Sequence, residues 1–515
     1  MSGRRAPLRC SADEAASLIG DGQTVACSGF VGCAHPEAIT AAIERRFLKD
    51  GSPLGLTLIY AAGQGDGKSR GLNHLAHEGL VRRVIGGHWG LAPGLGQLAL
   101  EGKIEAYNFP QGAISQLFRD IAAGRPGCIT HIGLGTFIDP RYGGGRLNTQ
   151  TPVGPIERIK LGGTEWLWYK SFPIDVALLR ATAADNAGNL VMDREAIIGE
   201  ILPIAQAVRN SGGTVIAQVS EIRSEAALPH LVRVPGILVD RIVVADPAEH
   251  EQTFAESYND AYCSPLPLGE LRHALGAPLP QDERRVIATR ACDELSDKAV
   301  ANLGIGMPEG IAKIAAERGL LDRFTLTVES GPTGGIPASG LSFGASVHPE
   351  AILDQPAQFD FYDGGGLDFA ALGFAQIDEK GNVNVSKFGK RLAGVGGFVN
   401  ISQTARKIVF CGTLTAGGLK VEVGQGGIRI VEEGTQKKFV RRIEQVSFNA
   451  SRALRAGQEV LVVTERAVFR VVQAGLELLE VAPGVDLERD VLGQMAFRPL
   501  IRNVRPMASH VFCLP

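Results

Sequence analysis

The sequence predicts an α/β fold built from two related open α/β domains, with mainly parallel sheets flanked by helices. One observation is the alternation of short β-branched runs with helix-like stretches, the pattern of parallel strands joined by crossover helices. A second is the length of 515 residues, which requires at least two domains at ~100–200 residues each. A third is an internal repeat, because two short motifs of the first half recur in the second.

The first domain begins with Ser11-Ala-Asp-Glu14, which is typical of a capping box that opens a helix. A strand over 24–27 and a helix over 37–47 follow, and Pro36 stands at the first position of that helix. The same alternation predicts further strands over 56–62, 81–85, 104–109, 176–183, 190–192, 214–220 and 241–245, and helices over 71–78, 96–101 and 112–123.

The repeat consists of Pro-Glu-x-Ile at Pro36 and Pro308, and of Asp-x-x-Gly-Asn at Asp185 and Asp378. The interval between the two motifs is longer by about 79 residues in the first half, which predicts an insertion there. A stretch rich in proline and glycine separates the halves. We expect an N-terminal domain over 1–263, a linker over 264–282 and a C-terminal domain over 283–515, with a ligand site at their interface.

Composition excludes several classes of protein. The net charge of −3 gives no general attraction to nucleic acid or to acidic membranes. Residues 1–10 lack the apolar core of a secretory signal, and no apolar run approaches the ~18 residues of a membrane span. The eight cysteines form no Cys-x-x-Cys pair, so neither disulfides nor zinc is expected. We expect a cytoplasmic protein with reduced thiols and no metal.

Three motifs resemble catalytic signatures but lack their context. Ala62-Gly-Gln-Gly-Asp-Gly-Lys-Ser69 nearly fits a phosphate-binding loop, but the first glycine is missing and no convincing helix follows. Such a loop can still line a cavity or bind an anion through its N–H groups. Gly340-Leu-Ser-Phe-Gly344 lacks the strand and helix of a nucleophile elbow. His74-x-x-His77 is not a zinc-protease motif.

The stretch around Glu329 is the main candidate for chemistry. Phe324 to Val328 alternate apolar residues with threonine, which predicts a half-buried strand. Glu329 then stands at the carboxyl end of that strand, before a glycine-rich loop, where open parallel sheets place ligand sites. Taken alone, the stretch favours a carboxylate that caps a turn.

Two glycine-rich segments lie downstream, at 364–366 and 394–397. Backbone without Cβ atoms can approach a ligand closely, and its N–H groups can face a developing oxyanion. Composition alone favours two tight turns.

The order of these motifs resembles family I coenzyme A transferases, in particular the single-chain bacterial acetate or propionate branch, with succinyl-CoA:3-ketoacid transferases as further relatives. The resemblance covers nearly the whole chain. It rests on the segments Gly304-Ile-Gly-Met-Pro-Glu309, Val328-Glu-Ser-Gly331, Phe359-Asp-Phe-Tyr-Asp-Gly-Gly-Gly366, Gly381-Asn-Val-Asn-Val-Ser386, Gly394-Val-Gly-Gly397, Asn108-Phe-Pro-Gln-Gly112 and Thr130-His-Ile-Gly-Leu-Gly-Thr136.

The resemblance implies a role for each candidate residue. It implies that Glu329 is the nucleophile; with an ordinary pKa near ~4.3 it would be ionised at neutral pH and need no general base. The other implied site residues are Gly396, Gly397 and Gln111 at the oxyanion hole and acyl site, and Gly304, Gly306 and Met307 in a CoA-binding loop. Asn400 stands near the position where the 3-ketoacid branch has an acidic residue. This mismatch leaves the assignment of the acyl pocket undecided.

The implied activity is transfer of CoA between short-chain acyl-CoA and free carboxylates, by a ping-pong mechanism through an acyl-glutamyl anhydride and a glutamyl-CoA thioester. CoA is then a substrate, with no permanently bound cofactor. An acyl-CoA hydrolase using the same glutamate, a 3-ketoacid CoA-transferase and a non-catalytic CoA-sensing regulator are the alternatives. Relatives of this kind form homodimers or homotetramers, so the resemblance implies one of these assemblies.

Overall fold

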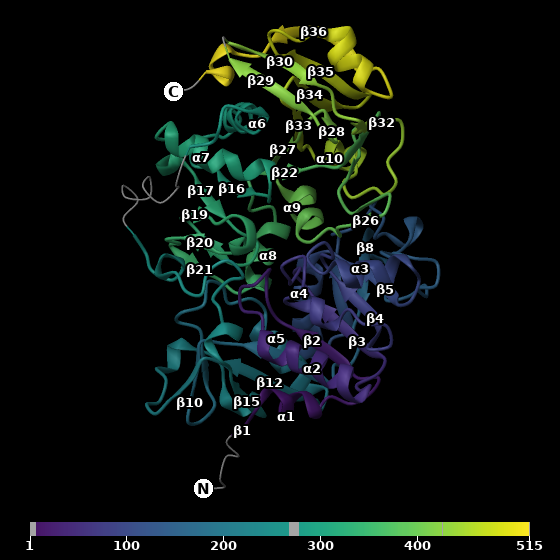
Figure 1. Cartoon of the computed structure of the whole chain (residues 1–515). Coiled ribbons are helices and arrows are strands. Elements are labelled where there is room, and N and C mark those ends of the chain that lie inside the picture. Colours follow the sequence, from purple (N-terminus) through teal and green to yellow (C-terminus); the bar gives the residue numbers. More distant parts are fainter. Residues whose placement is uncertain (1–6, 267–277, 425, 514–515) are drawn as a thin grey trace.

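The structure is a computed structural model that describes residues 7–266, 278–424 and 426–513. Its two halves lie one above the other in Figure 1, the purple-to-teal first half below and the green-to-yellow second half above. Each half is built around one large sheet with helices on both faces. The predicted α/β class with parallel sheets flanked by helices is thereby confirmed.

The first sheet has eight strands, and every neighbouring pair is parallel. Their order is β1 (Leu8–Cys10), β15 (Arg241–Val244), β12 (Thr214–Val219), β9 (Val176–Arg180), β2 (Thr24–Cys27), β3 (Leu56–Tyr60), β4 (Val81–Gly86) and β5 (Glu105–Asn108). Strands β3 and β9 are buried along their whole length. This explains why they are almost continuously apolar, since a parallel sheet is covered on both faces.

Alternate side chains of this sheet enter two separate hydrophobic cores. Val25 and Leu58 pack with one core, together with α1 (Ala12–Ser17), α2 (Glu37–Asp50) and α3 (Pro93–Leu100). Ala26 and Ile59 enter the other, together with α4 (Gln111–Ala122) and α5 (Ile201–Asn210). The predicted capping box is present at α1, where Ser11 and Glu14 bond each other's backbone N–H.

The second sheet is parallel only in its centre. The parallel strands are β17 (Thr325–Thr327), β16 (Val300–Leu303), β22 (Phe369–Gly373), β27 (Lys407–Cys411) and β33 (Glu459–Val463). Antiparallel strands join at both sides, and all but β21 follow their neighbour through a short turn, which a parallel pair could not use. They are β18 (Pro332–Thr333) and β21 (Ala351–Ile352) on one side, and β34 (Ala467–Val472) and β35 (Gly475–Val481) on the other, beyond which β36 (Leu500–Pro506) pairs parallel with β35.

Helices cover the second sheet as they do the first. On one face lie α6 (Glu283–Cys292) and α7 (Gly310–Glu317), and on the other lie α8 (Gln355–Asp363), α9 (Phe398–Thr404) and α10 (Ala450–Arg455). The core that holds α8 and α9 is continuous with the core that holds α4, so it runs from one half into the other. Figure 1 shows α4 facing α8 and α9 across this boundary.

The internal repeat is visible in two turns of the same geometry. Between β10 (Ala183–Asp185) and β11 (Leu190–Val191), Asp185 accepts from the backbone N–H groups of residues 187 and 189 and from the Asn189 amide. Between β23 (Gln376–Asp378) and β24 (Val383–Asn384), Asp378 accepts from the corresponding groups of residues 380 and 382. The same side chain organises the same turn in both halves.

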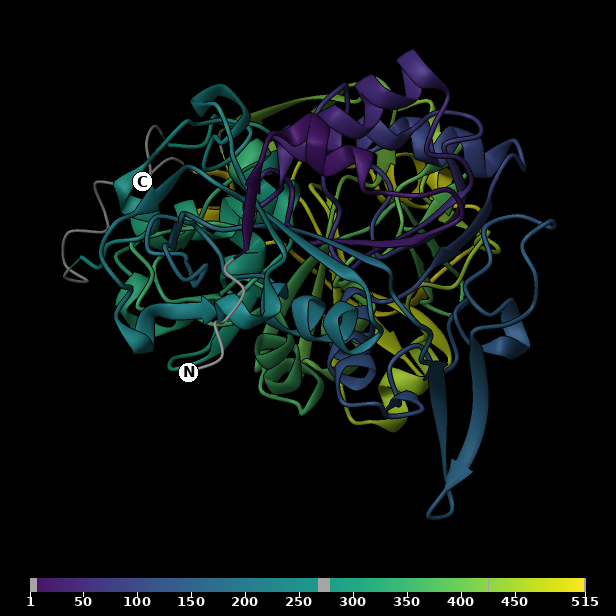
Figure 2. The same cartoon turned by 90° about the horizontal axis from the view of Figure 1, so that it is seen from below.

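The first half also contains a three-stranded antiparallel sheet that the sequence analysis did not predict. It consists of β6 (Gly127–Thr130), β8 (Thr164–Lys170) and β7 (Ile156–Leu161). Gly162 and Gly163 close the β7–β8 hairpin, both with positive φ, as a two-residue hairpin turn requires. In Figure 2 a blue hairpin, the colour of residues 150–170, projects from the body of the molecule.

The structure does not confirm what the sequence predicted for the segments 71–78 and 264–282. The helix expected over 71–78 is wrong: only a 3-10 turn at Leu72–Leu75 forms, because the backbone leaves helical geometry at Ala76, where ψ is 48°. The linker expected over 264–282 falls mainly on residues 267–277, which lie outside the described residues, so the domain boundaries stay predictions. Within the described ranges, no helix is both long and apolar enough to cross a bilayer.

Candidate active site

Glu329 lies just beyond the carboxyl end of β17, as the sequence predicted, and only 7% of it is exposed. The neighbouring strand β16 supplies Asn302, whose Nδ2 donates to Glu329 Oε2 at 3.2 Å and to the Thr327 carbonyl at 3.3 Å. Asn302 is itself almost fully buried. Two adjacent parallel strands therefore place an amide donor against a buried carboxylate.

The environment of Glu329 is not the ordinary one assumed from the sequence. Burial raises the pKa of Glu329 above its usual value, because the charged form loses hydration; the residue's own backbone N–H and the Asn302 amide oppose this shift. The expectation of an ordinary carboxylate pKa is therefore corrected. A poorly solvated carboxylate is more basic, and so a better nucleophile once its proton is lost.

The glycine loop at 394–397 lies against Glu329, and most of its N–H groups are already bonded. Gly394 donates to the Ser386 carbonyl at 3.0 Å, Val395 to Asn108 Oδ1 at 3.1 Å and Gly396 to the Gly87 carbonyl at 2.8 Å. The Gly397 N–H makes no hydrogen bond to any residue that the structure describes. Of the two predicted oxyanion donors, the Gly396 N–H is occupied and the Gly397 N–H is available.

Gly397 also lies close to the Glu329 side chain. A Cβ atom at this position would lie 3.3 Å from Glu329 Cγ. Gly396 has a φ of +51°, and a Cβ atom there would come no nearer than 3.6 Å to Gln111 Oε1. A side chain at 397 would crowd Glu329, and one at 396 would be strained by the backbone conformation.

Gln111 belongs to the first half but lies at this same loop. It is the first residue of α4, its backbone N–H donates to the Gly396 carbonyl at 2.9 Å, and its side-chain Nε2 donates to Gln355 Oε1 at 3.1 Å. The structure thus brings Gln111, Gly396, Gly397 and Glu329 together at the boundary between the halves.

These residues line one cavity of about 400 Å³. The first half contributes Phe30, Val31, Gly63, His88, Leu91 and Gln111, and the second half contributes the rest of the lining. The wall is predominantly apolar and includes the aromatic side chains of Phe343, Phe374, Phe388 and Phe398. Val31 has a φ of +54°, which is rare for a β-branched residue and marks local backbone strain beside the cavity.

The predicted CoA-binding loop divides between two cavities. Gly304 lines the Glu329 cavity, with Ile305 beside it. Gly306 and Met307 instead line a separate cavity of about 470 Å³, with Arg284 and Lys313. The loop therefore lies between the two cavities, and of the three predicted CoA-binding residues only Gly304 lines the cavity that contains Glu329.

Sequence reasoning missed His88 and Asn302. His88 follows β4 and lines the Glu329 cavity, and its buried Nδ1 has no hydrogen-bond partner among the described residues. Burial lowers the pKa of His88 to about 4, with a contribution from the Arg391 charge, so the ring is neutral near pH 7. The sequence did contain a signal for each residue. Asn302 is an amide inside the apolar strand Val300–Leu303, and His88 lies between Gly87 and Gly90.

The motifs set aside from the sequence have structural partners of their own. In the phosphate-loop-like segment, Asp66 Oδ1 accepts from the N–H groups of residues 68, 69 and 70, so these donors are occupied. His74 bonds Glu37 and Glu44, and His77 bonds Glu44. Among the residues described, no group of three or more His, Cys, Asp or Glu side chains is arranged to hold a metal ion.

Comparison with known proteins gives a consistent result. Residues 9–245 match the family model described as coenzyme A transferase. The chain is 44% identical to the acetate CoA-transferase YdiF of Escherichia coli K12 over 95% of this chain and 92% of that protein. It is also 44% identical to the caffeate CoA-transferase of Acetobacterium woodii over 98% of this chain and 97% of that protein.

The fold agrees with solved structures over almost its full length. The acyl-CoA transferase YdiF of Escherichia coli O157:H7, solved as the apoenzyme, matches with a TM-score of 0.93 and 42% identity over 99% of this chain and 97% of that one. The same protein, solved as a thioester complex with CoA, matches with a TM-score of 0.93, also at 42% identity, over 99% of this chain and 96% of that one.

Proposed function

The chain belongs to the coenzyme A transferase family, and from this premise we propose that it moves CoA between an acyl-CoA and a free carboxylate through a thioester on Glu329. The observation that carries the mechanism is the buried Glu329 carboxylate, which lies beside the unbonded Gly397 N–H at the wall of a largely apolar cavity.

The first half-reaction forms the covalent enzyme. A Glu329 oxygen attacks the thioester carbonyl, the C–S bond breaks, and CoA leaves as its thiolate, which yields an acyl-glutamyl anhydride. The thiolate then attacks the glutamyl carbonyl and the acyl group leaves as a carboxylate. A glutamyl-CoA thioester remains, and a second carboxylate reverses these steps to leave as the new acyl-CoA. One thioester replaces another, so no ATP is needed.

The site residues stabilise the charge that each step develops. We assign the Gly397 N–H, which has no partner among the described residues, as the donor to the oxyanion of a tetrahedral intermediate. A donor of this kind is typically worth about 10²–10³ in rate. The Asn302 amide holds one carboxylate oxygen and so orients the other towards the substrate. Contacts to the remote parts of CoA then supply binding energy for the reacting end.

Hydrolysis is the competing outcome of the same intermediates, because water can attack the anhydride or the thioester. The cavity favours transfer: its wall is mostly apolar, and Glu329 is 7% exposed. An apolar site disfavours ordered water near the reacting carbonyl.

The acceptor acid is the finer question. Two relatives at equal identity are named for acetate and for caffeate, which differ greatly in size. Acetate and propionate are the acids we propose, and the apolar aromatic lining also suits a larger acyl group. Relatives named as succinyl-CoA:3-ketoacid coenzyme A transferases match at 24–27% identity over at least three quarters of this chain, or at 33% over 44% of it. These lower matches make 3-ketoacids the second candidate.

One experiment separates these outcomes. The protein is mixed with propionyl-CoA, and free CoA and new acyl-CoA are followed with and without acetate, caffeate or acetoacetate. We expect little CoA release without an acceptor and formation of the matching acyl-CoA with one. Release of CoA that is independent of acceptor, with no new acyl-CoA, would mean hydrolysis. An unreactive acid is excluded as an acceptor.

Assembly and location stay proposals. We propose a homodimer or homotetramer in the cytoplasm, with CoA as an exchangeable substrate. Light scattering coupled to size exclusion gives the mass of the particle; a value near the chain's own 54.5 kDa would contradict an oligomer.

A further inference from the structure

Asn400 joins the end of the glycine loop to the first half of the molecule. It is fully buried in the first turn of α9, three residues after Gly397, and its Oδ1 accepts from the Gly112 N–H at 3.2 Å. The approach is so close that a Cβ atom at position 112 would lie 2.4 Å from Asn400 Nδ2. Together with the bond from the Gln111 N–H to the Gly396 carbonyl, this contact holds the loop and α9 against α4.

Asp363 determines which way the Asn400 amide faces. Asp363 is the last residue of α8, and Asn400 Nδ2 donates to its two oxygens at 2.9 and 3.1 Å. An ionised carboxylate only accepts hydrogen bonds, so it selects the amide orientation with the NH₂ group towards α8 and the oxygen towards Gly112. In the flipped orientation the amide oxygen would face the carboxylate, and the NH₂ group would face the Gly112 N–H.

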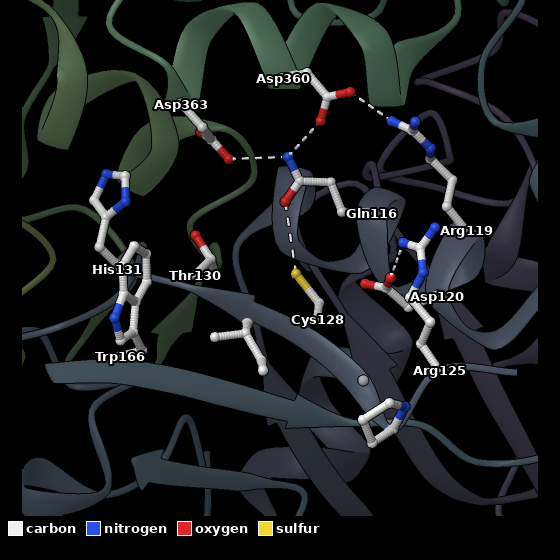
Figure 3. Close-up of a pocket in the computed structure, with 13 residues that line it drawn as sticks. Gln116, Arg119, Asp120, Arg125, Cys128, Thr130, His131, Trp166, Asp360 and Asp363 are labelled. Atoms are coloured by element: carbon white, nitrogen blue, oxygen red, sulfur yellow. Dashed lines mark hydrogen bonds and ion pairs between the residues drawn. The ribbon is translucent and has the colours of Figure 1, made fainter. Parts of the chain in front are cut away.

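The other side of Asp363 faces an open cavity of about 550 Å³, separate from the Glu329 cavity (Figure 3). In this view Gln116 stands between two carboxylates, and its Nε2 donates to Asp363 Oδ2 at 3.2 Å and to Asp360 Oδ1 at 3.1 Å. Arg119 pairs with Asp360, and Arg125 pairs with Asp120. The hydrogen-bond partners of Asp363 are therefore amides, while the nearby cations are paired with other carboxylates.

The charge state of Asp363 is consequently sensitive to its surroundings. Burial raises its pKa to about 7; Asp360 adds in the same direction, and the amides of Asn400 and Gln116 oppose the shift. The other titratable groups that line the cavity are Cys128, whose thiol pKa is raised by burial, and His131, whose pKa is lowered by burial. Neither supplies a positive charge near neutral pH.

From these contacts we propose that Asp363 is a positioning residue for the transfer reaction: it fixes the Asn400 amide and thereby holds α9, with the Gly397 N–H at its start, in register with α4. This inference rests on the proposed role of Glu329 and Gly397. Asp363 is not part of the Glu329 cavity wall, so it acts through Asn400 and not on the substrate.

Reciprocal exchange of the two side chains tests the proposal. In Asn400→Asp two carboxylates face each other, and we expect kcat at pH 8 to fall about tenfold or more, with partial recovery towards pH 6 as the pair shares a proton. In Asp363→Asn the selection of amide orientation weakens, and we expect a loss of about threefold to tenfold. The KM for acyl-CoA should change by less than about twofold in each case.

The double variant, Asp363→Asn with Asn400→Asp, carries the decisive prediction. The amide introduced at position 363 donates to the carboxylate introduced at position 400, which still accepts from the Gly112 N–H. We expect kcat to return to within about threefold of the starting protein, as coupled neighbours allow. Asp360→Asn is the matched control, because Asp360 lines the same cavity but does not contact Asn400. Its kcat should be unchanged.

Two results would overturn the positioning role: a double variant no better than Asn400→Asp, or single variants with full kcat. If Asn400→Asp does not fold, the kcat of the double variant must still exceed the kcat of Asp363→Asn. Each kcat is expressed per active site by counting the Glu329 peptides that carry CoA after reaction with acyl-CoA. If no Glu329 peptide of the starting protein carries CoA, the proposed mechanism fails. If that peptide carries CoA but the double variant does not recover kcat, only the role of Asp363 fails.

Discussion

The backbone of Gly397 lies directly against the side chain of Glu329, so that a Cβ atom at 397 would approach Glu329 Cγ to 3.3 Å. Gly397 has ordinary helical φ and ψ of −78° and −7°, so alanine fits the backbone. Its Cβ atom would crowd the Glu329 side chain and lie 3.4 Å from Ile401 and Phe359. We expect Gly397→Ala to lower kcat about tenfold or more with little loss of stability, because small displacements at a reacting group are costly.

Gly396→Ala is the matched comparison for that variant. At φ +51° a Cβ atom has space but is strained, which costs roughly 1–2 kcal/mol of stability. Its N–H stays on the Gly87 carbonyl, so kcat should fall less than in Gly397→Ala. Steady-state kinetics and urea unfolding of both variants measure this. Equal kcat in the two would contradict the claim that close packing of Gly397 against Glu329 matters for the reaction.

Asn302 affects the pKa of Glu329. Its amide donates to Glu329 Oε2 and so lowers the pKa that burial has raised. Because only the deprotonated carboxylate attacks, activity falls as pH drops through the Glu329 pKa. Asn302→Ala raises that pKa further, so the acid limb of kcat/KM should move to higher pH.

Thr327→Val is the control for Asn302→Ala. The Thr327 hydroxyl accepts from Tyr362 and does not contact the carboxylate. The acid limb should therefore stay in place. A limb that moves equally in both variants, or in neither, would show that Asn302 does not tune Glu329.

Glu200 makes stability depend on pH. It is fully buried at the start of α5, and within the described part of the chain neither of its oxygens has a hydrogen-bond partner. Burial raises its pKa to about 8. Between its unfolded pKa near 4.5 and about 8, the unfolded chain has lost a proton that the folded chain keeps. Stability therefore falls as pH rises through this window, by up to about 1.4 kcal/mol per pH unit.

We expect Glu200→Gln to remove this pH dependence of folding stability, because the amide stays neutral at every pH. Glu195→Gln gives the opposite case: the Arg180 charge holds the pKa of Glu195 at about 2, so its loss should destabilise by roughly 3 kcal/mol at pH 6 and pH 9 alike. Denaturant unfolding at both pH values makes the comparison. Unchanged pH dependence in Glu200→Gln would show that Glu200 is not the source.

The sequence predicted the parallel strands well, because their apolar runs are separated by helices with clear start signals. The strand at 24–27 and the helix from Glu37 agree with the structure, and Glu329 lies where its strand predicts. The antiparallel additions were harder. β7 and β8 have mostly polar or half-exposed faces, so their alternation carries little signal.

The site was predictable only in part, because hydrogen bonds between distant residues leave no local pattern. The occupied N–H of Gly396 depends on Gly87, and the orientation of Asn400 depends on Gly112 and Asp363. The raised pKa of Glu329 likewise follows from burial between two halves of the chain. The motif around Glu329 predicts the residue, while its chemistry is set by tertiary contacts.

The central claim is the covalent role of Glu329, and peptide mass spectrometry after reaction with propionyl-CoA tests it most directly. Without an acceptor acid, the peptide that contains Glu329 should gain a mass matching CoA bound with loss of water. Acetate should then remove the adduct and yield acetyl-CoA, and Glu329→Ala should show neither adduct nor turnover. An unmodified Glu329 peptide, together with full turnover by Glu329→Ala, would contradict the mechanism.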